Sequence, residues 1–182
     1  MKGPARIVLA FAALLAACGG NTPSTSSADD VLNRALQAHT AGKLDEATAA
    51  YFETLAKDPK NKFAFYNLGV IAQGQNRAAA AEAYYRLALE QDARMGSAIF
   101  NLAILRALAG ANQEAADLYR RVIAIDPNYA AAHFNLGLVL RLLGQNAEAQ
   151  QELATAQRLD PKLVAPSPSA SPARQASPSP AR

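Results

Sequence analysis

The fold of this 182-residue chain is decided by a stretch that recurs along it, and residues 96–129 show it clearly: GSAIFNLAILRALAGANQEAADLYRRVIAIDPNY. When the sequence is shifted by 34 residues, it aligns with itself. Three series keep this spacing: Asp58, Asp92, Asp126 and Asp160; Ala47, Ala81, Ala115 and Ala149; Tyr51, Tyr85, Tyr119 and Leu153. A period of this length predicts that each copy is one supersecondary unit, and that stacked copies bury a continuous core.

Four copies follow one another without insertion, at residues 28–61, 62–95, 96–129 and 130–163. A turn is expected inside each copy, where Gly or Asn recurs: Gly42, Asn76, Gly110 and Gly144. The Asp-Pro pair that closes three copies predicts the end of a helix, because proline disfavours helix at the preceding residue. Ser27-Ala28-Asp29-Asp30 resembles a capping box, which opens a helix. Each copy is therefore expected to hold two helices.

Three in-register segments carry a family resemblance: Tyr66-Asn67-Leu68-Gly69, Phe100-Asn101-Leu102-Ala103 and Phe134-Asn135-Leu136-Gly137. With the alanine and tyrosine series, this pattern resembles the tetratricopeptide repeat. The resemblance implies an all-α fold, a right-handed superhelix (α-solenoid) of four antiparallel helix pairs. The sequence departs from the family where Trp and Tyr are usual in the first helix. The Trp position holds Val31, Phe65, Ile99 and His133, and the Tyr position holds Ala38, Ala72, Arg106 and Leu140.

The resemblance also implies a binding surface, because the first helices of this family line a concave groove. The sixth position of each first helix is asparagine: Asn33, Asn67, Asn101 and Asn135. An amide both donates and accepts, so such a ladder can bind an extended peptide backbone, as in the similar superhelix of O-GlcNAc transferase. The alternative is that each asparagine merely bonds to the backbone of a neighbouring repeat.

Beside the ladder lie apolar and polar positions of the expected peptide-binding groove. The fifth and ninth positions hold Leu32, Tyr66, Phe100 and Phe134, and Val70, Ile104 and Leu138. If exposed, they suit a partner helix or strand; the alternative is packing between first helices. His39, Gln73 and Arg141 at the twelfth position are expected to add polar specificity at the rim. Lys62 and Arg141 do not reproduce the spacing of a carboxylate clamp.

The N-terminus predicts export. Lys2 and Arg6 precede an apolar stretch, residues 7–17, that is too short to span a bilayer. Leu15-Ala16-Ala17-Cys18 resembles the bacterial lipobox. This implies that residues 1–17 are a signal peptide, that Cys18 is lipidated and anchors the chain to a membrane, and that residues 18–27 are a flexible linker. Gly19 favours the outer membrane, facing the periplasm, if the source is Gram-negative. The alternative is that Cys18 is simply a small residue that follows an ordinary secretory signal.

The C-terminus changes composition abruptly. Residues 165–182 contain only Ala, Pro, Ser, Arg and Gln, so residues 164–182 are expected to be a disordered tail. No polar capping helix follows the last repeat, although such arrays usually need one. We therefore expect the region around Leu140, Leu143 and Leu153 to be covered by a second copy, giving a homo-oligomer, or by a partner.

Charge and residue inventory argue against other classes of function. Residues 28–163 hold all 15 acidic residues and 14 of the 18 basic ones, whereas a nucleic-acid binder needs a basic face. Two histidines and one cysteine leave no metal cluster of usual spacing. Gly42-Lys43 lacks the rest of a phosphate-binding loop. We expect no nucleic acid, no cofactor, no metal and no catalytic site.

Together these features predict a membrane-anchored interaction scaffold or adaptor in the bacterial cell envelope, which binds a peptide or helix of a protein client in its groove. Lipoproteins with this repeat that act as type IV pilus pilotins are similar in architecture alone. The alternative is a self-associating structural envelope protein without a specific client.

Overall fold

The computed structural model describes residues 26–165. The predicted signal peptide, Cys18 and nearly all of the tail lie outside the described residues. Residues 26–165 form eight helices and no strand: α1 (Ala28–Thr40), α2 (Leu44–Lys57), α3 (Lys62–Gly74), α4 (Ala78–Gln91), α5 (Gly96–Leu108), α6 (Asn112–Ile125), α7 (Ala130–Leu142) and α8 (Asn146–Leu159).

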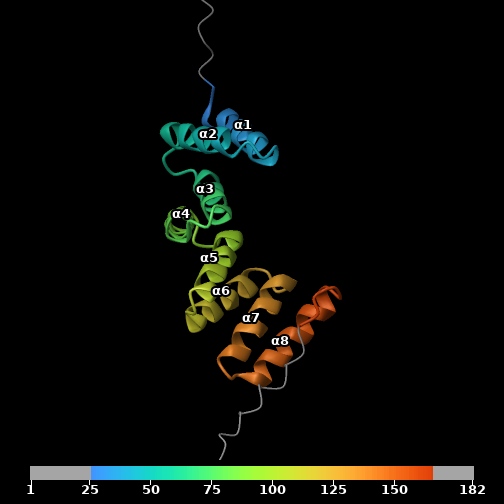
Figure 1. Ribbon diagram of the computed structural model, residues 1–182. Helices are drawn as coiled ribbons and strands as arrows, with labels where there is room; N and C mark the ends of the chain where they lie inside the picture. The colour runs from blue at the N-terminus through green and yellow to red at the C-terminus, as the bar shows by residue number, and fades with distance from the viewer. Residues whose placement is uncertain (1–25, 166–182) are drawn as a thin grey trace, which may run out of the picture.

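Each helix packs mainly against its partner in the same pair and against the next pair along the chain. Figure 1 shows the consequence: the pairs stack into an elongated, curved array with α1 and α2 at one end and α7 and α8 at the other. First helices begin at 28, 62, 96 and 130, which keeps the 34-residue spacing of the sequence. The predicted all-α repeat fold is confirmed.

The turn inside each pair has one geometry in all four copies. Gly42, Gly110 and Gly144 have φ of 74°, 77° and 76°, and Asn76 has φ of 58°. The amide after each of these residues donates to a carbonyl five residues earlier, as in the bond of 2.9 Å from Lys43 N to Ala38 O. This is the Schellman ending of a helix, which needs a left-handed residue at the turn position.

The second helix of each pair ends at an aspartate, whether or not proline follows. The four C-cap residues are Asp58, Asp92, Asp126 and Asp160. Each accepts, through Oδ1, the amide two residues later at 3.0–3.2 Å. The turn after Asp92 has Ala93 in place of proline and keeps this bond. The aspartate is therefore the common signal, because its side chain replaces the lost helical bonds.

The start of α1 confirms the predicted capping box. The Ser27 Oγ accepts from the Asp30 amide at 3.1 Å, while the Ser27 amide donates to Asp30 Oδ2 at 2.9 Å. These two bonds satisfy backbone donors that the first turn of a helix leaves without partners.

The departures from the family pattern in the first helices have local partners. Arg106 pairs with Glu82 of the preceding repeat and lies 3.4 Å from Glu114. His133 is buried, with Nδ1 2.6 Å from Glu152 Oε2 and Nε2 2.9 Å from the Pro127 carbonyl. Polar atoms that replace the usual aromatic rings are thus hydrogen-bonded, as burial requires.

The last repeat exposes less hydrocarbon than expected. Leu140 is fully buried in a core cluster that repeats 3 and 4 share, while Leu143 and Leu153 are half-buried. Exposed positions of α8 include Gln150, Gln151 and Gln157. The outward side of α8 therefore carries part of the polar cover that a separate capping helix provides elsewhere.

The helices of a pair approach most closely where the first helix has its smallest residue. A Cβ added to Gly69 would lie 2.6 Å from Cε1 of Tyr85, and one added to Gly137 would lie 2.6 Å from Cγ of Leu153. The Tyr85 ring is fully buried. It has no free space into which to retreat, so glycine at position 69 is a packing requirement.

We expect Gly69→Ala to destabilise the array by about 1–3 kcal/mol, the usual cost of overpacking a core. Gly74→Ala is the matched control on the same helix, because nothing lies within 4 Å of an added Cβ there. The gain in helix propensity from Gly74→Ala should leave the free energy of unfolding unchanged or raise it by up to about 1 kcal/mol. Urea denaturation followed by circular dichroism measures both, and equal midpoints for the two variants would refute the packing argument.

Candidate functional site

The asparagine ladder lies on the first helices, and its members have different surroundings. Asn33 is exposed, whereas Asn67, Asn101 and Asn135 are half-buried. Nδ2 of Asn67 donates to the Phe63 carbonyl of its own helix at 2.8 Å. No one pattern of internal hydrogen bonds thus explains the whole ladder.

The two later asparagines bind tyrosine hydroxyls of the preceding repeat. Nδ2 of Asn101 lies 3.2 Å from the Tyr85 hydroxyl and 3.4 Å from the Tyr66 hydroxyl. Asn135 hydrogen-bonds to the Tyr119 hydroxyl. Asn101 and Asn135 therefore bond to the preceding repeat through side-chain hydroxyls rather than through its backbone.

Two of the expected rim residues belong to the same network. The Tyr51 hydroxyl lies 3.2 Å from His39 Nδ1, and the Tyr85 hydroxyl donates to Gln73 Oε1 at 2.7 Å. Repeat 3 has Ala107 at this position, and there Asn135 serves Tyr119. Each buried tyrosine hydroxyl thus has a polar partner at the twelfth position of its own repeat, at the sixth position of the next, or at both.

The aromatic residues expected beside the ladder are half-buried and pack against other rings. The Tyr66 ring centroid is 5.9 Å from that of Tyr85, and the Phe100 centroid is 5.7 Å from Tyr119 and 4.9 Å from Tyr129. Phe134 is also half-buried. These side chains contribute to packing within the array and also to its surface.

The first-helix face carries an apolar pocket between α5 and α7, of about 360 Å³. Its floor contains the Tyr119–Asn135 pair, and its walls are hydrocarbon: Ile104, Ala107, Leu108, Leu138, Val139 and Leu142. Leu108 and Leu142 are 79% and 72% exposed, the highest values among the exposed large hydrophobic residues of 26–165. We call this site the α5–α7 pocket.

Sequence reasoning missed Leu108 and Leu142. They occupy the thirteenth position of the repeat, where the first two copies have Thr40 and Gly74. A signal was present, since this position also faces the groove in the family, but a leucine at the end of an apolar helix is usually part of the core.

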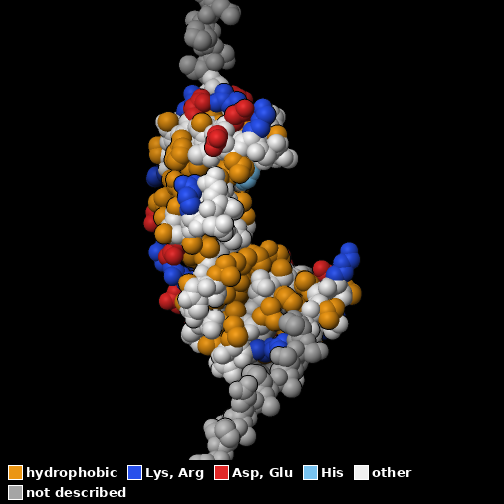
Figure 2. All heavy atoms as spheres, viewed as in Figure 1, with side chains coloured by type: hydrophobic (Ala, Val, Ile, Leu, Met, Phe, Trp, Pro, Cys, Tyr) orange, Lys and Arg blue, Asp and Glu red, His pale blue; other side chains and the backbone are white. Residues whose placement is uncertain are grey.

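The opposite end of this face is more polar. A depression of about 630 Å³ on α1 is lined by Asn33, Leu36, Gln37, Thr40 and Ala41. Figure 2 shows the molecule hollowed on one side, with hydrophobic side chains gathered over α5 to α7 at the lower border of the hollow. The first-helix face thus changes from polar in repeat 1 to apolar in repeats 3 and 4.

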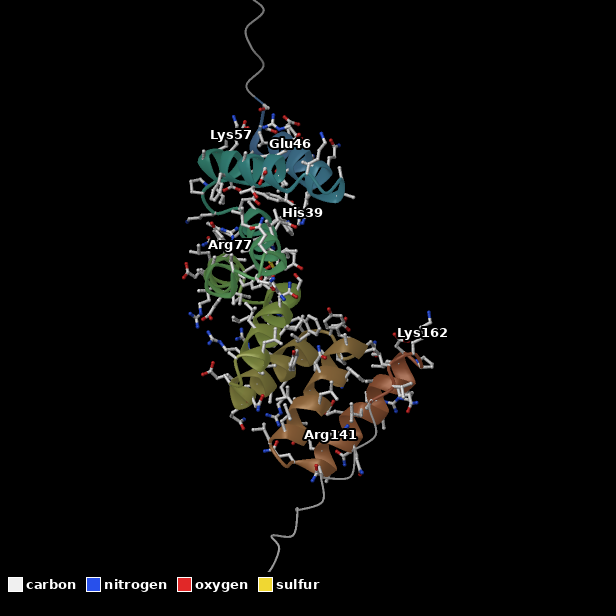
Figure 3. All side chains as sticks on the ribbon, viewed as in Figure 1. His39, Glu46, Lys57, Arg77, Arg141 and Lys162 are labelled. Carbon is white, nitrogen blue, oxygen red and sulfur yellow. The ribbon has the colours of Figure 1, made fainter. Side chains whose placement is uncertain are left out.

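The charged residues expected near the groove lie far apart. Lys62 pairs with Asp92 at 2.7 Å, and its Nζ is 5.2 Å from the Phe63 ring centroid. Figure 3 shows His39 on the underside of α1 and Arg141 at the distant lower end of α7. Neither arrangement brings together the cations of a carboxylate clamp.

Among residues 26–165, no three His, Cys, Asp or Glu residues could hold a metal ion together. No helix in the described part of the chain has the length and hydropathy needed to cross a bilayer.

Burial raises the pKa of Tyr51 and of Tyr119 to about 12. The unfolded chain releases these protons near pH 10, so their contribution to stability is complete below about pH 10 and is lost as the pH rises to about 12. We expect the Tyr51→Phe/Tyr119→Phe variant to lose less stability than the wild type over this window. Urea midpoints at about pH 9 and about pH 11.5 measure the difference; equal losses would contradict it.

Comparison with known proteins identifies the repeat. The tetratricopeptide repeat family matches residues 32–98 and 130–163, and a further match described as TPR repeat covers residues 106–144. No curated protein matches the chain. These family matches span all four copies of the 34-residue period.

Solved structures with the same fold are numerous, and 271 chains match. One crystal structure of MamA has a TM-score of 0.67 and 20% identity, over 74% of this chain and 79% of that one. Another has a TM-score of 0.66 and 24% identity, over 74% and 73%. A tetratricopeptide repeat protein from Parabacteroides merdae has a TM-score of 0.65 and 22% identity, over 74% and 54%. At these identities the likeness concerns the fold, while the matched repeats show that the chain belongs to the tetratricopeptide repeat family.

Proposed function

We propose that this protein is an interaction scaffold, anchored by lipid at Cys18 to a membrane of the bacterial envelope, which binds a protein client on the face formed by its first helices. The observation that carries the proposal is the composition of that face. Amide groups recur there at one register, and beside them lie the most exposed large hydrophobic side chains of residues 26–165. Exposed apolar surface next to polar side chains is typical of protein-binding sites.

The chemistry of the face supports binding without a reaction. The depression on α1 and the α5–α7 pocket are lined by amides, hydroxyls and hydrocarbon, and their linings include neither a nucleophile next to a base nor a pair of carboxylates. Ionised residues such as Arg120 and Glu148 pair elsewhere across repeats, at 2.9 Å. Such pairs at a partly exposed surface hold neighbouring repeats in register more than they add stability.

The anchor part of the proposal rests on the lipobox-like segment that ends at Cys18, outside the described residues. Ala28, where α1 begins, is ten residues further on. Ten residues span at most about 35 Å. A lipid at Cys18 would therefore keep the start of α1 within about 35 Å of the membrane surface.

We expect the triple change Asn67→Ala, Asn101→Ala and Asn135→Ala to abolish client capture, because it removes the amides from three repeats. In-cell crosslinking followed by mass spectrometry measures capture, and circular dichroism checks helicity. Since Asn101 and Asn135 also serve buried hydroxyls, each loss costs about 1–3 kcal/mol of stability. Tyr85→Phe is the control: it disturbs the same network from a fully buried position and should retain the client.

Two outcomes would go against this proposal. A client that remains crosslinked to the triple variant would exclude the ladder as the binding surface. Crosslinks that join only copies of this chain would favour the alternative, a self-associating structural element.

For the anchor, we expect Cys18→Ser to abolish incorporation of labelled fatty acid and to move the protein from the membrane fraction to the soluble fraction. The reason is that acyl chains supply the membrane affinity, at about 0.8 kcal/mol per buried CH₂. Ser24→Ala, in the same segment, should change neither property. Labelling of the Cys18→Ser variant at the wild-type level would rule out this attachment site.

A further inference from the structure

The α5–α7 pocket has walls that repeat one helical spacing. Ile104 and Leu108 are four residues apart on α5, and Leu138 and Leu142 are four residues apart on α7. Residues at this spacing stand one above the other on the same helix face. The pocket thus lies between two apolar ridges, one on α5 and one on α7, and a ridge of side chains from a third helix can pack between such ridges.

The pocket offers no charge to a partner. None of its eight lining residues is Asp, Glu, Lys, Arg or His. The one titratable group, Tyr119, is neutral at physiological pH like any tyrosine, and burial raises its pKa further, to about 12. A charged side chain placed here would lose hydration without gaining an opposite charge. The contacting face of the occupant must therefore be uncharged and apolar.

The state of the asparagine amides argues for a helix as the occupant over an extended chain. At least one amide N–H of Asn101 is already donated to a tyrosine hydroxyl, and Asn135 is bonded to Tyr119 on the floor of the pocket. An extended backbone would bring its own N–H and C=O groups against hydrocarbon walls with few partners, which is costly. A helix satisfies its backbone internally and presents only side chains.

The volume of the pocket sets how much of that helix it receives. About 360 Å³ is near the lower limit for ligand sites, enough for a few side chains and too small for a whole helix. Leu108 and Leu142 are mostly exposed, so they gain contacts when an occupant lies across the opening. An amphipathic helix resting on the surface, with one turn of apolar side chains inserted, fits both facts.

We propose that the α5–α7 pocket is the docking site for an amphipathic helix of the client, which inserts large uncharged apolar side chains spaced at i, i+3 or i+4, and i+7. This inference rests on the proposed function and deepens it by naming the chemistry of the partner. Repeats 1 and 2 lack the leucines at the thirteenth position, so this docking site belongs to repeats 3 and 4.

The test selects displayed random 16-residue peptides on the immobilised full-length chain and measures their affinity by fluorescence anisotropy. We expect selected peptides to share the helical apolar spacing and to gain helical ¹³Cα shifts when bound. The Leu108→Gln/Leu142→Gln variant, which keeps size and helix propensity, should weaken binding at least tenfold. Phe52→Gln is the matched control, since Phe52 is 48% exposed on α2, outside the pocket.

Three results would overturn the inference. Peptides with apolar residues at every second position, whose binding is lost in the triple asparagine variant and retained in the double leucine variant, would leave the proposed scaffold function intact and exclude a helical occupant. A homodimer in sedimentation that the double leucine variant converts to monomer would make a second copy the occupant. Failure to select any peptide sensitive to a first-helix substitution would contradict both the inference and the proposed function.

Discussion

The contact between the small residue of each first helix and the large residue of the following helix is the constraint on which this structure depends. In repeat 2 the Tyr85 ring lies directly over Gly69, with no room for a methyl group between them. The ring can be buried so deeply only because its hydroxyl reaches Gln73 in its own repeat and Asn101 in the next. One residue thus sets the distance within a pair and also links that pair to its neighbour.

This link gives the asparagine ladder a structural role beside the binding role that we propose for it. A tyrosine hydroxyl buried under the first-helix face requires a polar partner, and an amide from the following repeat meets that need. In repeat 3 the twelfth position holds Ala107, which has no polar side chain, and the amide of Asn135 supplies the bond to Tyr119. The polar network lies under the face, and the apolar residues project above it.

Much of the fold could be predicted from the sequence because its signals are local and repeated. The glycine and asparagine turns lie where the period places them, since a left-handed residue is needed after each first helix. The helix ends were predicted from Asp-Pro, but Asp92 followed by Ala93 shows that the aspartate alone suffices. The copy without proline thus shows that the aspartate is the essential part of the motif.

The candidate site could be predicted less fully, because it depends on contacts between repeats. The bond from Asn101 to Tyr85 joins residues 16 apart on different helices, and no periodicity reveals such a pairing. In the sequence, Leu108 and Leu142 resemble core residues. In the structure they lie at the ends of α5 and α7, where no other described helix covers them. Leu140 shows the opposite error: the sequence predicts it at the end surface of the array, but it is buried in a core cluster that repeats 3 and 4 share.

The replacement of tyrosine by Leu153 changes how the last pair could be extended. The hydroxyls of Tyr85 and Tyr119 bond to the asparagine of the following repeat, whereas Leu153 has no hydroxyl and packs against Gly137 through hydrocarbon alone. A fifth pair added after residue 163 would therefore find no hydroxyl for its sixth-position amide. A longer array built from this protein would need tyrosine at position 153 to continue the bond between repeats.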